Sequence, residues 1–135
     1  MCGRYTQYQA EVRYLERLNW QAPLAFEPSE EPLERYNVAP TTRVQLLHRD
    51  EDGLRISAVP WRYAPHWAQA QRDGKPRPHG KPVINATIEE APTNPYWREA
   101  WKNRCLVMAD GWYEWVADPE GKAGKQPYYI RLKSG

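Results

Sequence analysis

The residues best suited to covalent chemistry stand at the start of the chain, in Met1-Cys2-Gly3-Arg4-Tyr5. An initiator methionine followed by a small residue is normally removed, so the working N-terminus is predicted to be Cys2. Its α-amine and thiol would then lie two carbons apart, and free groups of these kinds titrate at about 7.7–8.0 and about 8.5. An aldehyde can form an imine with the amine, and the thiol can then close a five-membered thiazolidine ring. Because a cysteine after the start codon can also be an ordinary small residue, other motifs must decide.

The composition is that of one domain with no metal or disulfide framework. The chain has 135 residues, a net charge of +2 and two cysteines, Cys2 and Cys105, and no Cys/His spacing suggests a metal site. We therefore expect no cofactor, and we expect Cys105 to be a buried, inert thiol in an apolar strand. No apolar run approaches 18 residues, so we expect a cytoplasmic protein with no membrane partner.

The elements that must position Cys2 are predicted to be mainly strands, and the fold class is α+β. The basic segment 69–82 is interpreted as a flexible insertion within a single domain over 1–135. The other expected elements, in chain order, are a helix over 9–20, an extended segment over 36–41, a hairpin over 42–48 and 54–59, an aromatic loop over 61–67, a short strand over 82–86, a helix over 94–102 that buries Trp97 and Trp101, a buried strand over 104–109, the tight turn Asp110-Gly111, a partner strand over 112–116, a flexible loop over 118–126 and a last strand over 127–132.

Four stretches together carry a family resemblance: Cys2-Gly3-Arg4-Tyr5, Tyr36-Asn37-Val38-Ala39-Pro40, Ile84-Asn85-Ala86 and Ala109-Asp110-Gly111-Trp112-Tyr113-Glu114-Trp115. In this order and spacing the chain resembles the SOS response-associated peptidase family, also called the SRAP domain. The loop from Trp61 to Trp67 is similar to that family's Trp-Gly-x-x-Pro-x-Trp loop. The resemblance implies a mostly antiparallel, barrel-like core flanked by short helices.

The same resemblance implies a sensor that shields abasic sites in single-stranded DNA, in association with replication forks. Cys2 would form the thiazolidine with the ring-opened deoxyribose, Glu114 would be the acid/base carboxylate, and Asn85 would bond near the amine or the sugar. Gly3 and Arg4 would bind the DNA, with Arg4 contacting a phosphate, and Trp61 and Trp67 would stack on bases beside the lesion. Asn37 and Pro40 would shape the loop under Cys2. The sequence sets no oligomeric state.

Two departures from the family pattern bear on this expectation. Thr87 stands where the family usually has an arginine that could clamp a phosphate, and Glu90 adds negative charge, so DNA affinity should be weaker. The chain is also expected to lack the family's C-terminal strands and their His-x-Arg-type motif. None of His48, His66 or His79 lies in a matching context, so none is assigned the role of that histidine.

Three other interpretations use the same residues differently. An N-terminal cysteine with a free amine also suits an N-terminal-nucleophile amidohydrolase or peptidase, including one that removes its own Met1. A non-catalytic module for single-stranded DNA would use the aromatic and basic side chains without Cys2. A degenerate fragment would have no activity. Hydrolysis of amides would indicate the first of these. DNA binding that survives loss of Cys2 would indicate the second, and inactivity the third.

Overall fold

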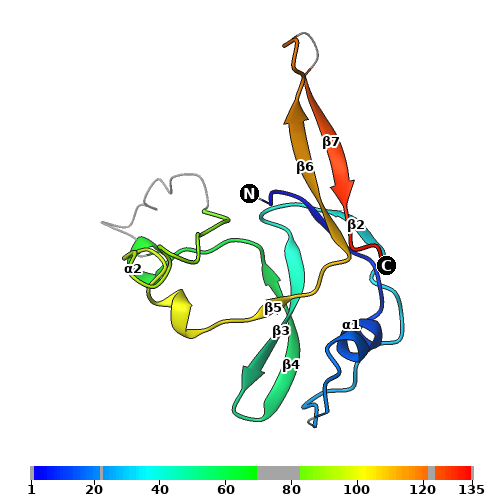
Figure 1. Ribbon diagram of the computed structural model, residues 1–135. Coiled ribbons are helices and arrows are strands. Elements are labelled where there is room, and N and C mark those ends of the chain that lie inside the picture. Colours follow the sequence, from blue (N-terminus) through cyan, green and yellow to red (C-terminus); the bar gives the residue numbers. More distant parts are fainter. Residues whose placement is uncertain (1, 22, 70–82, 122–123, 135) are drawn as a thin grey trace.

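The computed structural model describes residues 2–21, 23–69, 83–121 and 124–134, and it confirms the α+β class with mostly antiparallel strands (Figure 1). Within this part of the chain the strands form two open sheets and no closed barrel. Their orders are β2-β1-β6-β7 and β4-β3-β5. The elements are β1 (Tyr5–Gln7), α1 (Glu11–Arg17), β2 (Arg35–Val38), β3 (Arg43–Asp50), β4 (Gly53–Pro60), α2 (His66–Gln69), the 3-10 turn η1 (Ala100–Lys102), β5 (Leu106–Val107), β6 (Gly111–Ala117) and β7 (Lys125–Ile130).

Strand β1 lies inside the first sheet, with antiparallel neighbours on both sides. All three of its residues are buried, and Tyr5 packs with Val38 of β2 and Val44 of β3 in one apolar cluster. Since residues of a central strand bond to two neighbours, the chain just before β1 starts from a well-fixed position. That preceding chain is Cys2-Gly3-Arg4.

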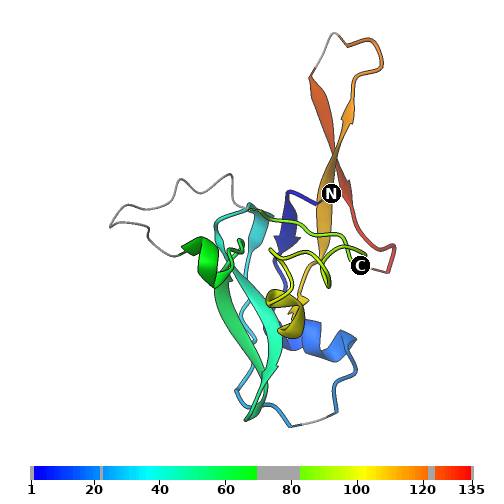
Figure 2. The same cartoon turned by 90° about the vertical axis from the view of Figure 1, so that its left-hand side faces the viewer.

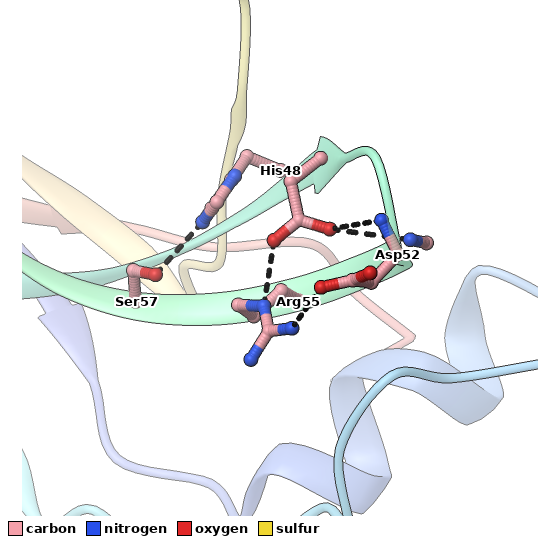
Figure 3. A network of polar contacts seen from close by, with 6 residues as sticks. His48, Asp52, Arg55 and Ser57 are labelled. Carbon is pink, nitrogen blue, oxygen red and sulfur yellow. Dashed lines mark hydrogen bonds and ion pairs between the residues drawn. The ribbon is translucent and has the colours of Figure 1, made fainter.

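The predicted hairpin over 42–59 is confirmed as β3 and β4, paired from Arg43↔Pro60 to Asp50↔Gly53. Asp50 closes its turn by accepting hydrogen bonds from the amides of Asp52 and Gly53 at 3.0 and 3.2 Å, and from Arg55 Nε at 2.7 Å. The bond from Arg55 is the main reason why the pKa of Asp50 is lowered. In the same network, shown in Figure 3, His48 Nε2 lies 2.7 Å from Ser57 Oγ across the hairpin. His48 thus has a structural partner within the second sheet.

The buried side chain of Gln7 joins the two sheets. Its Nε2 donates to the carbonyl oxygens of Gln45 at 2.7 Å and Met108 at 3.0 Å, and its Oε1 accepts from the Gln45 amide at 3.3 Å. A buried amide satisfied on both ends is a directional link, because each of its atoms would lose a partner if the sheets moved apart.

The predicted turn at Asp110-Gly111 is wrong, and so is the pairing of segment 104–109 with segment 112–116. Gly111 begins β6, which pairs with β1 and β7, whereas β5 pairs with β3 in the other sheet. Segment 104–109 is therefore not a buried strand: only Leu106–Val107 is a strand, and both residues are more than half exposed. A contact between β1 and β6, over 100 residues apart in sequence, overrides the local turn signal.

The predicted helices are shorter than expected. The first covers Glu11–Arg17 instead of 9–20, and the segment 94–102 is a series of turns ending in η1, with Trp97 and Trp101 only half-buried. Asn94 still caps these turns, since its Oδ1 accepts from the Tyr96 amide at 2.8 Å. The aromatic loop runs into α2 at His66.

The remaining segments depart from prediction at their bounds. The expected strand over 82–86 is reduced, in its described residues, to a bridge between Val83 and Tyr63. The last strand begins at Lys125, two residues before its predicted start. The basic insertion over 69–82 lies outside the described residues except for Gln69, as does Met1.

The hairpin of β6 and β7 projects from the rest of the molecule, as both views show (Figures 1 and 2). All six residues of β7 are exposed, Tyr128 and Ile130 among them. None of the helices in the described residues is long and apolar enough to span a membrane.

Candidate functional site

Cys2 is half-buried and lies three residues before β1 of the first sheet. Its thiol lies 3.4 Å from the carbonyl oxygen of Arg4, and its side chain packs against the cluster of Tyr5, Val38 and Val44. The carbonyl oxygen of Cys2 accepts a hydrogen bond from Asn85 Nδ2 at 3.1 Å. Two residues 83 positions apart, each singled out from the sequence, are thus in direct contact.

Arg4, two residues after Cys2, forms hydrogen bonds to both strands that flank β1. Its guanidinium donates to Asn37 Oδ1 of β2 at 3.1 Å, and its carbonyl oxygen accepts from the Tyr113 amide of β6 at 2.9 Å. Asn37 was expected to shape the loop under Cys2; in the structure its side chain accepts a hydrogen bond from Arg4. The guanidinium is therefore oriented near the N-terminus.

Glu114 lies half-buried on β6. The register of β1 with β6 pairs Tyr5 with Trp112 and Thr6 with Gly111, and the bond from Tyr113 to Arg4 continues it. Extended past these residues, the same register would bring Glu114 opposite Gly3, next to Cys2 in the chain.

The two loop tryptophans occupy different places. Trp61 is half-buried, packs edge-to-face on Tyr5 with 5.3 Å between ring centroids, and donates from Nε1 to the Ile84 carbonyl at 3.3 Å. Trp61 therefore packs between Tyr5 and the backbone of Ile84, the residue before Asn85. Trp67 is 48% exposed and touches Tyr96 edge-on, within a separate aromatic cluster. Of the pair, Trp67 has the accessible ring.

Two residues of the site were missed by sequence reasoning. Tyr5 is buried, and its hydroxyl has no hydrogen-bond partner within the described part of the chain. Burial raises the pKa of Tyr5 to about 12; Arg35 opposes this rise and Cys2 adds to it.

The second is Asp110, a buried carboxylate that accepts from the Tyr8 amide at 2.7 Å, from Gln9 Nε2 at 2.5 Å and from the Tyr14 hydroxyl at 2.6 Å. An acidic residue inside an apolar stretch was the available signal. Asp110 connects the start of β6 to the end of β1 and to α1, and so helps to set the register that places Glu114.

Cys105 was expected to be buried and is exposed, because the segment that carries it is not a core strand. Partial burial of its thiol still raises its pKa, which lowers its reactivity at neutral pH. Among the described residues, no three His, Cys, Asp or Glu side chains gather in a way that could hold a metal ion.

Comparison with known proteins decides the family. The model of the SOS response associated peptidase (SRAP) family matches residues 1–135. The chain belongs to this family. Relatives include the abasic site processing protein YedK of Escherichia coli, 37% identical over all of this chain and 55% of YedK, and YoqW of Bacillus subtilis, 32% identical over 99% of this chain and 55% of YoqW.

A solved structure has a similar fold. It is a phage-related protein of Bordetella bronchiseptica, 36% identical, with a TM-score of 0.70 over 98% of this chain and 56% of its own. The chain thus spans about half the length of these relatives and of the matched solved structure.

Proposed function

We propose that this SRAP-family protein captures abasic sites in single-stranded DNA by forming a thiazolidine between Cys2 and the aldehyde of the ring-opened deoxyribose, after removal of Met1. The observation that carries the proposal is the bond from Asn85 Nδ2 to the Cys2 carbonyl, which fixes the backbone of the nucleophile. The names of the relatives, which are abasic site processing proteins, support the same substrate.

The chemistry balances with the loss of one water. The α-amine of Cys2 adds to the aldehyde carbon, and departure of the hydroxyl as water leaves the imine. The thiol sulfur then attacks the imine carbon, and its proton ends on the nitrogen. Since the ammonium must lose a proton and the hydroxyl must gain one, a nearby carboxylate can serve both transfers. Glu114 takes this role in the proposal, because the register of Tyr5 with Trp112, if extended by two residues, would bring it opposite Gly3.

The remaining side chains bind the DNA. Arg4, oriented by Asn37, pairs with a phosphate, which holds the strand without reading its sequence. The exposed ring of Trp67 stacks on a base beside the lesion. Trp61 does not contact the DNA and instead holds the backbone of Ile84, next to Asn85. Base stacking suits a lesion sensor because every base offers a flat face. The protein would meet such DNA in the cytoplasm, at replication forks.

The test is to mix the protein with single-stranded DNA that holds one abasic site, and to analyse the product by denaturing gel and intact mass. We expect a heat-stable adduct with the mass of the protein without Met1 plus the DNA minus one water. Undamaged DNA and a Cys2→Ala protein should give none, whereas a matched Cys105→Ala protein should give the full amount. Absence of the adduct from a folded protein shown to lack Met1 would rule out this chemistry.

The same samples separate the alternatives. A borohydride-trapped adduct of Cys2→Ala that equals the wild type in amount would mean that the imine alone accounts for capture. Binding of intact and abasic DNA with equal affinity, in wild type and Cys2→Ala alike, would indicate a plain DNA-binding module. Cleavage of an amide substrate without DNA would indicate the peptidase that the family's name suggests.

A further inference from the structure

The hydroxyl of Tyr5 differs from most buried polar groups in having no use within the core. Tyr5 is 5% exposed, and its hydroxyl has no hydrogen-bond partner within the part of the chain that the structure describes. Buried polar groups are nearly always paired, because an unpaired one gives up its bonds to water and gains none in return. Packing alone therefore gives no reason for a hydroxyl at this position.

The ring that carries the hydroxyl is held on several sides. Trp61 packs on it edge-to-face with 5.3 Å between ring centroids, and Val38 and Val44 pack with it in the same apolar cluster. The backbone of Tyr5 belongs to β1, which is paired with β2 and with β6. The hydroxyl is thus kept at one place before anything binds, as a preorganised donor must be.

Cys2 packs against this same cluster. As a thiol it has a partner, because its Sγ–H donates to the Arg4 carbonyl oxygen at 3.4 Å. A thiolate has no proton to donate, so the carbonyl oxygen would repel it and the sulfur would need a donor instead. The chain has room to turn here, since a Cβ added at Gly3 would have no atom of the described residues within 4 Å.

The electrostatics of Tyr5 agree with a nearby sulfur. Burial raises the pKa of Tyr5 to about 12, the Arg35 guanidinium of β2 opposes this rise, and Cys2 adds to it. The side chains of β3, of β4 and of the aromatic loop that belong to the cluster carry no charge: Val44, Val59 and Trp61. The hydroxyl therefore keeps its proton, and remains a donor, over the pH range in which thiols ionise.

We propose that Tyr5 is a positioning residue for Cys2: its hydroxyl donates a hydrogen bond to the sulfur once the thiol has lost its proton and turned away from Arg4. The inference rests on the proposed function, in which this sulfur attacks the imine carbon. The thiol proton leaves to solvent and Tyr5 keeps its own, so no covalent bond of Tyr5 changes. By stabilising the thiolate, the hydrogen bond speeds the closing of the ring.

The test uses a Cys105→Ala parent, in which Cys2 is the sole thiol of the sequence. Alkylation of Cys2 by iodoacetamide is followed by intact mass, without DNA, from about pH 6 to about pH 10. At about pH 7, adding Tyr5→Phe should slow alkylation by about tenfold, because hydrogen bonds to ionised groups are strong. The difference should close at the alkaline end, where the thiol is ionised in both proteins.

The matched control is Tyr36→Phe, which removes an exposed hydroxyl from β2 and should leave the alkylation rate of the parent unchanged at every pH. Equal rates in Tyr5→Phe and the parent overturn the inference, and so does an equal loss in Tyr36→Phe. A rate lowered by the same factor at every pH also overturns it, because that result would mean altered access to the thiol.

Crosslinking to abasic DNA gives a second measurement. Tyr5→Phe should slow thiazolidine formation by a similar factor without lowering the amount of imine trapped by borohydride, because the amine forms the imine without the thiol. Equal loss of both products would mean that Tyr5 only shapes the site, and would overturn the inference. Alkylation needs no DNA, so it tests Tyr5 even where the protein forms no adduct.

Discussion

At the scale of single residues, the site is organised by what holds Cys2 and not by Cys2 itself. Its carbonyl is bound by Asn85, its thiol packs on the β1–β3 cluster, and Arg4 is turned by Asn37. As the proposed nucleophile, Cys2 would lose little conformational freedom on reaction, which would favour a covalent step between correctly placed groups.

Replacing Glu114 by Gln should slow adduct formation by about 100-fold or more, because the amide cannot transfer protons. Binding of undamaged single-stranded DNA and the free energy of unfolding should change little. The initial rate of crosslinking on a denaturing gel measures the effect, with Glu31→Gln in an exposed loop as the matched control. A Glu114→Gln protein that crosslinks at the wild-type rate would remove Glu114 from the mechanism.

A second prediction compares two buried tyrosines, one whose hydroxyl has no hydrogen-bond partner among the described residues and one whose hydroxyl donates a hydrogen bond. Tyr5→Phe removes a buried hydroxyl that has no partner among the described residues, and should raise the free energy of unfolding by roughly 1 kcal/mol. Tyr14→Phe removes the donor to buried Asp110 and should lower it by about 1–3 kcal/mol. Urea unfolding measures both, and effects of equal sign would contradict the assignment of these bonds.

At the scale of elements, the sheets depend on close contacts that a single methyl group would disturb. At Gly111, a Cβ atom would lie 2.5 Å from the Ile130 carbonyl oxygen and 2.6 Å from the Tyr129 hydroxyl. Gly111→Ala should therefore push β7 away from β6 and destabilise the fold by about 1–3 kcal/mol. Gly124→Ala is the control, because no atom of the described residues lies within 4 Å of the added Cβ, and it should leave the melting temperature nearly unchanged.

The elements that the sequence predicted correctly are those set by local signals. The β3–β4 hairpin follows from two apolar runs around Asp50-Glu51-Asp52-Gly53, since turn and strand signals agree. The predicted pairing of segment 112–116 with segment 104–109 was wrong, because β6 pairs with β1 and β7. No local signal in Asp110-Gly111 reveals a partner at the other end of the chain.

The candidate site was predicted in the same uneven way. Cys2, Asn85 and Glu114 were singled out by motifs, and the contact between Cys2 and Asn85 is now visible, whereas their roles stay predictions. The bonds to Asp110 were not predicted, because they join residues whose separate contexts gave no sign of a common network.

At the scale of the whole molecule, buried tyrosines couple stability to alkaline pH. The pKa of Tyr5 is raised to about 12 by burial, and burial together with the bond to Asp110 raises that of Tyr14 further. An unfolded chain loses these protons near pH 10, while the folded chain keeps them. The stability linked to the two protons is therefore complete below about pH 10 and is lost as the pH rises toward and beyond about 12.

Urea unfolding at about pH 9 and about pH 11 measures this loss. The free energy of unfolding should fall less steeply in a Tyr14→Phe protein than in the wild type, because one of the linked protons is absent. An identical slope in the two proteins would show that other groups control the alkaline transition.

The central position of β1 has a mechanical consequence. Cys2 lies three residues before a strand that is bonded to β2 on one side and to β6 on the other. A pull on Cys2 along the strand would load both rows of hydrogen bonds together and in shear, whereas a pull on an edge strand would open its bonds one after another. If a DNA strand is joined to Cys2 as proposed, a force that pulls on that strand would be resisted by the hydrogen bonds in the middle of the first sheet.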